Sequence, residues 1–343
     1  MKKGDNMKIF KKIVCYSFII LFTPLIFIAC KTKEPSYTDG LEYKLSSNGQ
    51  YYILTDIGMA QGDTINIPNQ FNGLDVKVIG ESAFEDYSFI KKVIMPNSIT
   101  TIERSAFKNC NSLTSIVFSN NLKLIEDYAF YNCKNLQNID IPNSIEELGD
   151  YSFYGCESFT ILEIDENIKK VGKSSFYNCI NLEKLYFNAK NCQNFGTQSY
   201  VFYKAGQNVQ TGLIVYIGNS VQSLPAYIFC NNFIYEYSPN IMNVIFEENS
   251  NCSYIGYYSF AYCNNLTSIV IPSSVNTIDS CAFNHCNNLE TATFENTNNW
   301  MGTTKGSNIQ TVTINSSELT NPETASTYLS NTYSSYCWIR KNL

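Results

Sequence analysis

The sequence predicts a β-rich repeat solenoid, a fold in which short units stack on one another and share one continuous core. Three observations predict it. Apolar residues recur at intervals of 23 residues over a long stretch of the chain. Each unit contains a short segment of alternating character, as expected of a half-buried strand. A single unit has too few apolar side chains to offset the entropy of ordering it, so its neighbours must complete the core.

The N-terminus has the features of an export signal. The first 12 residues contain five lysines and one aspartate, and an uncharged apolar run from Ile13 to Ala29 follows. A basic segment followed by an apolar one is typical of a signal peptide, although the run is also close to the shortest length that spans a membrane. We therefore expect a signal peptide over residues 1–29.

The residues at the end of this run resemble a bacterial lipobox. Ala29 is the small residue that precedes the cysteine of such a motif, whereas Phe27 and Ile28 depart from its usual residues. The resemblance implies that Cys30 is lipidated and becomes the N-terminus of an exported, membrane-anchored lipoprotein on the outer surface of a bacterium. Residues 30–40 would then be a tether. Plain secretion and an uncleaved anchor remain the alternatives.

Charge and cysteine content exclude some classes of protein. The formal net charge is −6, and removal of a leader with five lysines and one aspartate would leave about −10. This charge argues against nucleic acid as a partner. Of the 13 cysteines, Cys15 lies in the leader and Cys30 is the lipidation candidate, which leaves eleven. An odd number cannot form a complete disulfide framework, so free buried thiols are expected.

The repeat is regular over five consecutive units and then resumes after insertions. The positions that recur every 23 residues include Ile79, Ile102, Ile125, Leu148 and Val171; Phe84, Phe107, Phe130, Phe153 and Phe176; and Tyr87, Cys110, Cys133, Cys156 and Cys179. The interval stretches after Leu185, and the register recovers from Ile255 onward. We count nine units over residues 79–296.

Within each unit, the alternating segment is expected to be a strand. Ile116-Val117-Phe118 and its equivalents should form a parallel ladder with strands about 4.8 Å apart. Pro96-Asn97-Ser98 and similar segments mark the turn that follows, where a proline is tolerated because the strand has ended. The Ala-Phe segments, such as Ala106-Phe107, are expected to form short helical turns on the convex side, with the phenylalanine pointing inward.

These residues resemble a known repeat family. A fixed period of 20 to 29 residues with a short strand is characteristic of leucine-rich repeats. The unit Ile-x3-Ala-Phe-x2-Cys-x2-Leu-x2-Ile-x-Ile-Pro is similar to the BspA-type leucine-rich repeat of bacterial surface proteins. Residues 41–78 resemble the β-rich N-terminal cap of that family, and residues 297–343 its C-terminal cap. Caps cover the apolar ends of a repeat array.

The resemblance also implies a function. Family members are surface adhesins, which suggests a non-enzymatic protein that engages host extracellular-matrix or cell-surface macromolecules, either protein or glycan. A structural envelope component without a specific ligand is one alternative. A carboxylate-dependent glycoside hydrolase is another, because such enzymes have no local sequence signature.

Motifs for other chemistry are missing from the sequence. The lone histidine, His285, lies beside Cys286 within a repeat, which favours a structural role. The spacing of Cys281, His285 and Cys286 matches no known zinc pattern. The sequence contains no phosphate-binding glycine loop, HExxH or GxSxG element. We therefore expect no catalytic residues, no metal and no cofactor.

Two sets of equivalent positions in successive repeats suggest alternatives to this expectation. Asp140 and Glu163 are equivalent positions of adjacent units, where paired strands would place them about 4.8 Å apart. Such a pair would raise a pKa or hold a cation, but two solvated carboxylates are the simpler expectation. The cysteine column from Cys110 to Cys179 has a spacing that permits disulfides, although buried thiols are favoured.

Recognition is expected to use residues that the core leaves free. On the strands of a solenoid these form an outward row along a concave sheet. The row comprises Ile94, Val117, Asp140, Glu163, Tyr186, Tyr216, Ile245, Val270 and Thr293. We predict the binding face at Asp140, Glu163, Tyr186, Tyr216 and Ile245, because tyrosines often anchor interfaces.

A second candidate row is expected on the convex side. Each of its members follows a buried phenylalanine or its equivalent: Tyr131, Tyr154, Tyr177 and Tyr203. These tyrosines either present flat ring faces to a sugar or an aromatic partner, or only shield the turns beneath them. The insertions at residues 188–212 and 231–240 are further candidates, because insertions in repeats form loops that often carry function.

Overall fold

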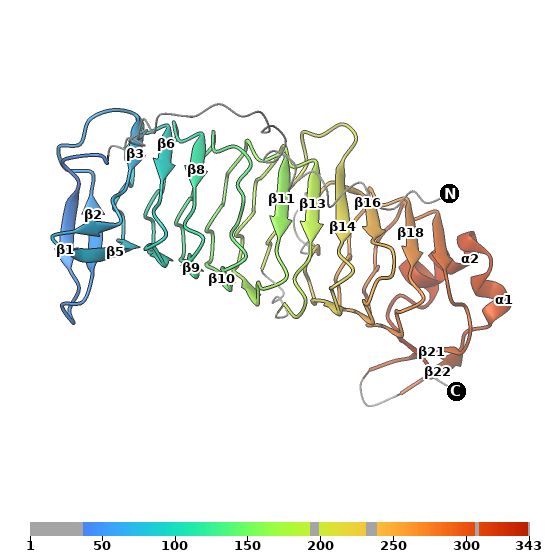
Figure 1. Ribbon diagram of the computed structural model, residues 1–343. Coiled ribbons are helices and arrows are strands. Elements are labelled where there is room, and N and C mark those ends of the chain that lie inside the picture. The colour runs from blue at the N-terminus through green and yellow to red at the C-terminus, as the bar shows by residue number, and fades with distance from the viewer. Residues whose placement is uncertain (1–36, 193–198, 231–238, 306–308, 342–343) are drawn as a thin grey trace, which may run out of the picture. The chain divides into compact units, whose positions relative to one another are not determined.

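The computed structural model describes residues 37–192, 199–230, 239–305 and 309–341. Residues Tyr37–Leu343 form one compact unit. In this unit the repeats stack in chain order, and each contributes short strands to ladders that run along the stack (Figure 1). The predicted β-rich solenoid with parallel strand ladders is confirmed. The expected signal peptide, Cys30 and most of the tether lie outside the described residues.

The first ladder, called the strand face below, contains the strands that the alternating segments predicted. Its pairs are parallel, and it runs in three sections. These are β3 (Thr64–Asn66), β6 (Lys92–Ile94) and β8 (Ser115–Val117); β11 (Ile161–Ile164), β13 (Lys184–Phe187), β14 (Leu213–Ile217) and β16 (Ile241–Phe246); and β18 (Ser268–Ile271) with β20 (Thr291–Phe294).

A second ladder is built mostly from two-residue strands that follow the turn after each strand-face segment. Its first section contains β5 (Leu74–Ile79), β7 (Thr101–Ile102), β9 (Leu124–Ile125), β10 (Glu147–Leu148) and β12 (Lys170–Val171), and its second contains β15 (Ser223–Leu224), β17 (Tyr254–Ile255) and β19 (Thr277–Ile278). The break between β12 and β15 falls where the strand face is continuous from β11 to β16. The two ladders are therefore interrupted at different places along the stack.

The segments that contain the repeated phenylalanine, called the turn side below, form successive turns instead of the expected short helical turns. In one unit the N–H of Ala106 donates to the carbonyl of Glu103, and the N–H of Phe107 donates to the carbonyl of Ala129 in the next unit, at 2.7 Å. Residues at positive φ, such as Ser105 (56°) and Asn109 (60°), aim alternate N–H groups along the stack. Hydrogen bonds to the next unit replace those that a helix would form within itself.

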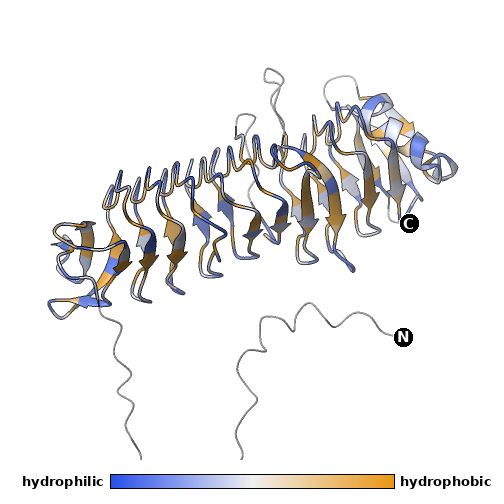
Figure 2. Cartoon of the chain, turned by 90° about the horizontal axis from the view of Figure 1, so that it is seen from above, coloured by the Kyte–Doolittle hydropathy of each residue, from blue (hydrophilic) through white to orange (hydrophobic). Residues whose placement is uncertain are grey.

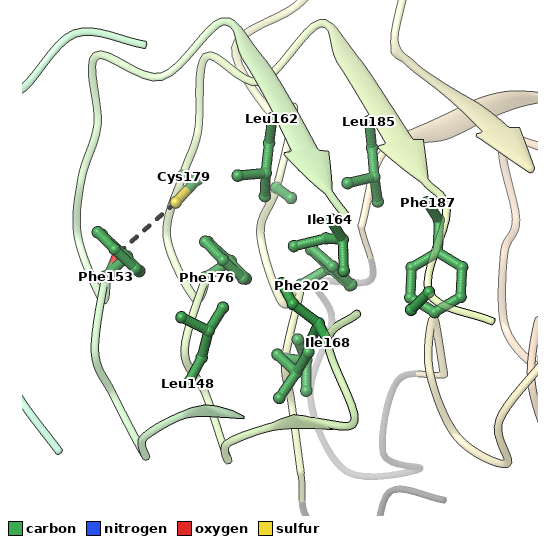
Figure 3. Packing of buried hydrophobic residues seen from close by; sticks show 14 of the residues in the cluster. Leu148, Phe153, Leu162, Ile164, Ile168, Phe176, Cys179, Leu185, Phe187 and Phe202 are labelled. Atoms are coloured by element: carbon green, nitrogen blue, oxygen red, sulfur yellow. Dashed lines mark hydrogen bonds between the residues drawn. The ribbon is translucent and has the colours of Figure 1, made fainter. Parts of the chain in front are cut away.

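The core lies between these three sides and is continuous along the stack. Figure 2 shows hydrophobic segments recurring on successive units. The repeated phenylalanines from Phe84 to Phe283 stack with ring centroids 4.8 to 5.6 Å apart. Figure 3 shows Phe153, Phe176 and Phe202 in this column, with leucine and isoleucine side chains beside it. Each unit thus completes the core of its neighbours, as a repeat array requires.

The two ends of the described unit carry elements that differ from the repeat. At the N-terminal end, β1 (Glu42–Leu45) pairs antiparallel with β2 (Tyr52–Asp56), and β4 (Gln70–Phe71) pairs with β5. At the C-terminal end are β21 (Trp300–Thr303), β22 (Thr311–Thr313), the helices α1 (Ser316–Leu319) and α2 (Pro322–Thr327), the π-helical turn Tyr328–Thr332 and β23 (Cys337–Arg340). Trp300 and Trp338 are buried against Phe294 of the last strand-face segment.

Candidate functional site

The central section of the strand face places the predicted binding residues in one row. Glu163 pairs with Tyr186, Tyr186 with Tyr216, and Tyr216 with Ile245 in the parallel registers of β11, β13, β14 and β16. Burial alternates along these strands, so that Leu185 and Val215 point into the core while the row residues between them reach the surface. Four of the five predicted residues are therefore neighbours on one surface.

The two tyrosines of this row form a stacked pair. The rings of Tyr186 and Tyr216 are 4.7 Å apart between centroids, at an interplanar angle of 12°. Both residues are half-buried, and Ile245 beyond them is 37% exposed. One face of each ring is covered by the other ring, and both residues remain partly exposed. The pair thus offers a rigid, amphipathic contact area of the kind found in interface anchors.

The structure does not assemble the carboxylate pair in the way that the sequence suggested. The segment of Asp140 forms no strand, and no pairing joins it to β11. Asp140 and Glu163 are both exposed, and Glu163 accepts a hydrogen bond from the amide of Asn188 at 3.2 Å. The expectation that paired strands hold Asp140 beside Glu163 is wrong, and Figure 1 shows no arrow on the strand face between β8 and β11.

At this interruption a side chain accepts the hydrogen bonds of the ladder. In regular units the N–H groups of two successive residues donate to one backbone carbonyl of the preceding unit, as Glu183 and Lys184 do to Thr160. The N–H groups of Thr160 and Ile161 instead donate to the side-chain oxygen of Asn138, at 2.8 and 2.9 Å. The amide side chain of Asn138 thus takes the place of the backbone carbonyl in the ladder.

The second predicted row lies on the turn side and is also stacked. The centroid distances from Tyr131 to Tyr154, Tyr177 and Tyr203 in succession are 4.6, 4.7 and 4.7 Å. Burial, followed by the neighbouring tyrosines, raises the pKa of Tyr154 to about 12. The rings cover one another's faces, and Tyr203 is buried. The ring faces between successive members are therefore covered, and the interior of the row offers ring edges to a sugar or an aromatic partner.

Sequence reasoning missed a parallel tyrosine row beside this one. Tyr128 and Tyr151 stack at 4.9 Å, and each also packs against the next row member, Tyr131 or Tyr154. Arg104 lies over the ring of Tyr128 at 5.1 Å. The signal was present in the sequence, because Tyr128 and Tyr151 are separated by one repeat length.

Sequence reasoning also missed a crevice beyond Ile245. Among the described residues β16 and β18 are not paired, although they follow one another along the strand face (Figure 1). The crevice over these strands has a volume of about 750 Å³, and Phe246 and Val270 are among its lining residues. The signal was the spacing, since nine positions separate Phe246 from Ile255 where seven separate Ile271 from Ile278.

The cysteine column is explained by the turns. The four cysteines of the column from Cys110 to Cys179 form no disulfide within the described residues. The thiols of the column donate to the carbonyl of the phenylalanine one unit back, for example Cys133 to Phe107 at 3.0 Å and Cys179 to Phe153 at 3.7 Å (Figure 3). Burial raises the pKa of the Cys110 thiol to about 12. These thiols are structural donors, since the thiolate form that would react is disfavoured.

The remaining candidates for chemistry are the lone histidine and possible metal ligands. His285 is exposed, has a φ of 58° and stacks on Tyr262 at 4.6 Å. In the described part of the chain, no group of three or more His, Cys, Asp or Glu side chains is arranged to hold a metal ion. No helix among the described residues is long and apolar enough to cross a membrane. Parts of both candidate insertions, 193–198 and 231–238, lie outside the described residues.

Comparison with known proteins identifies a family. A family model described as the BspA type leucine rich repeat region matches residues 77–208 and 229–334, in six copies. No curated protein sequence matches the chain.

Several solved structures resemble this one. A leucine-rich repeat protein of T. pallidum shares 24% identity over 56% of this chain and 86% of its own, with a TM-score of 0.49. A leucine-rich repeat protein of Bacteroides ovatus shares 17% identity over 76% and 88%, with a TM-score of 0.40. A protein of Faecalibacterium prausnitzii described as a leucine rich cell surface protein shares 20% identity over 76% and 94%, with a TM-score of 0.37.

Proposed function

Because the chain belongs to the BspA-type leucine-rich-repeat family, we propose that it is a cell-surface binding protein whose strand face engages a host extracellular-matrix or cell-surface protein or glycan. Its partner would contact the Tyr186–Tyr216 pair and the apolar residues beside it. The repeat motif itself consists of core residues, so specificity must come from positions such as these that the core leaves free.

One observation carries this proposal. Exposed apolar side chains gather on the strand face: Val117, Ile161, Ile245 and Val270 are between 37% and 49% exposed. The stacked tyrosines of β13 and β14 lie in the same section as two of them. Contiguous exposed apolar surface is uncommon on a soluble protein and marks interaction sites.

The proposal includes export and anchoring. The basic and apolar N-terminal segment and the lipobox-like sequence before Cys30 support a lipoprotein held on the outer surface of a bacterium. Metabolic labelling with a fatty-acid precursor tests the anchor. The label should be incorporated by the wild-type chain and lost in Cys30→Ala, and equal labelling of the two would contradict lipidation at this cysteine.

Binding is tested with the full-length protein against immobilised extracellular-matrix proteins and glycans. The variant is Tyr186→Ala/Tyr216→Ala, and the matched control is Tyr128→Ala/Tyr151→Ala, a stacked pair on the turn side. Loss of an aromatic anchor costs about 2 kcal/mol or more, which is roughly a thirtyfold loss of affinity. We expect this loss for the strand-face variant and near wild-type affinity for the control.

Two outcomes would contradict the proposal. If the control variant loses binding and the strand-face variant keeps it, the tyrosines of the turn side are the recognition surface. If the wild-type protein binds nothing in the panel, the chain fits the alternative of a structural envelope component better than that of an adhesin.

A further inference from the structure

At the crevice over β16 and β18, the core residue Phe246 is partly exposed. Phe246 occupies the position that is buried in the neighbouring units, where Ile217, Ile271 and Phe294 are at most 6% exposed. Phe246 itself is only half-buried. Together with Ile245 and Val270, which are 37% and 49% exposed, it gives the crevice an apolar floor.

The crevice follows from local features of β16 and of the segment after it. Met242 is a bulged residue, because Leu213 and Ile214 of β14 pair with Ile241 and Asn243. The longer connection after Phe246 then carries the chain outward through residues 247–250 before β17 begins. A bulge re-aims a strand and often ends its pairing. β16 therefore pairs with β14 on one side and leaves its other side open toward β18.

The rim of the crevice is acidic. Glu247, Glu248 and Glu295 line it, and none of the three is in an ion pair within the described part of the chain. Glu247 accepts a hydrogen bond from the N–H of Asn219, and Glu295 accepts one from the N–H of Ser273. A basic side chain also reaches the rim, because Arg340 donates to the carbonyl of the lining residue Ser273. Within the described residues, the three carboxylates therefore have no lysine or arginine partner in an ion pair.

From this arrangement we infer that the crevice is a docking site for a protein segment in which an apolar side chain is flanked by lysine or arginine. The apolar side chain packs on Phe246 and Val270, and the basic side chains meet the rim carboxylates. The volume of about 750 Å³ is within the range of ligand sites, and the crevice lies along the strand face where an extended segment can reach it. This inference rests on the proposed binding function and names the partner's chemistry.

The test uses fluorescein-labelled peptides of about eight residues with a central Leu or Phe between lysines, and the same peptides with glutamates in place of the lysines. Binding to the full-length protein is measured by fluorescence anisotropy. We expect Glu248→Gln/Glu295→Gln to bind the lysine peptide about tenfold more weakly, since two charge pairs are lost while both side chains keep their size. Val270→Thr, which keeps the shape of the floor, should weaken binding several-fold.

The matched control is Glu81→Gln/Glu166→Gln, which removes the same number of charges at exposed positions away from the crevice. A photo-reactive version of the peptide should cross-link to residues 243–250 or 268–273. The inference is overturned if the control weakens binding equally, if the glutamate peptide binds as well, if cross-links map elsewhere, or if no peptide binds. None of these results would contradict the proposed function, which is tested separately by the dependence of matrix binding on Tyr186 and Tyr216.

Discussion

Individual residues on the turn side adopt conformations that their type normally avoids. Ser82, Ser105 and Ser174 are at positive φ, a region that small polar residues tolerate, but Tyr128 and Tyr151 adopt φ of 58° and 57° at the same repeat position. A bulky residue in that region is strained by about 1–3 kcal/mol. Stacking between the two rings, worth about 0.5–1.5 kcal/mol, offsets part of this cost. Sequence alone could not indicate this conformation, because tyrosine is a poor signal for it.

Buried serines of the turn side give a prediction about stability. The hydroxyl groups of Ser152 and Ser175 are buried and have no hydrogen-bond partner among the described residues, whereas alanine occupies this repeat position at Ala106 and Ala129. Ser175→Ala should raise the free energy of unfolding by about 1 kcal/mol, because an unsatisfied polar group is removed. Urea denaturation measures it.

The reverse substitution is the control. Ala106→Ser buries a hydroxyl at the equivalent position and should lower the free energy of unfolding by about 1–3 kcal/mol. A loss of stability in Ser175→Ala would show that its hydroxyl has a partner and would refute the argument.

At the scale of elements, the sequence predicted the strands correctly where no side chain competes for the backbone hydrogen bonds of the ladder. The segments at Ser115–Val117 and Lys184–Phe187 form strands in the expected register. The equivalent segment at Asp140 was predicted with equal reason and is not a strand, and the side chain of Asn138 there accepts the hydrogen bonds from the next unit. Apolar periodicity does not report such competition between a side chain and the backbone.

This role of Asn138 can be tested by substitution. Asn138→Ala leaves the N–H groups of Thr160 and Ile161 without their acceptor, so the free energy of unfolding should fall by about 1–3 kcal/mol. Hydrogen exchange at these two amides should become faster. Gln137→Ala, at the exposed neighbouring position, is the control and should leave both measurements nearly unchanged. Unaltered exchange in Asn138→Ala would mean that a backbone carbonyl accepts these bonds in solution.

The C-terminal elements are joined to the second ladder by an ion pair that predicts a pH dependence. Asp279 follows β19 and is 7% exposed, and its carboxylate contacts Lys305, from the segment between β21 and β22, and the hydroxyl of Tyr254. Burial alone would raise the pKa of Asp279, but hydrogen bonds from Lys305, Tyr254 and the N–H of Ser280 hold it below its ordinary value.

A carboxyl whose pKa is lowered by folding stabilises the protein above its unfolded pKa of about 3.9, and this stability is lost as the pH falls through the folded value. Asp279→Asn should therefore lower the free energy of unfolding by about 1–2 kcal/mol at pH 7, a modest effect because Lys305 is exposed to solvent. The difference from wild type should shrink as the pH falls below the unfolded pKa and should disappear once the pH is below the lowered folded pKa. Asp63→Asn, in the exposed pair with Lys91, should show a weaker pH dependence. A difference that persists in acid would contradict the assignment.

At the scale of the whole described unit, the phenylalanine stack and the two ladders hold the repeats together. Where one ladder is interrupted, the other continues. Where the strand face is interrupted between β8 and β11, the second ladder continues through β9, β10 and β12. Where the second ladder is interrupted between β12 and β15, the strand face continues. Because neighbouring units supply each other's stability, this staggering leaves no boundary between units without a sheet to bridge it.

The candidate site was only partly predictable from the sequence, because the outward row follows the repeat and the crevice does not. The row Glu163, Tyr186, Tyr216 and Ile245 followed from periodicity, because fixed spacing fixes register. The crevice arises where the spacing between repeats changes. The length of an insertion does not indicate how far apart it leaves the two strands on either side, here β16 and β18. Periodicity therefore predicts the surface row that the repeats share. It cannot predict the crevice, which is formed where this chain departs from the repeat.

The central claim is that the strand face is the recognition surface, and hydroxyl-radical footprinting of the full-length protein with a ligand from the binding panel tests it most directly. The account predicts reduced oxidation of Tyr186, Tyr216 and Ile245 in the complex, with Tyr128 and Tyr151 oxidised as in the free protein. Reduced oxidation of Tyr128 and Tyr151 with no change at the strand-face residues would contradict it.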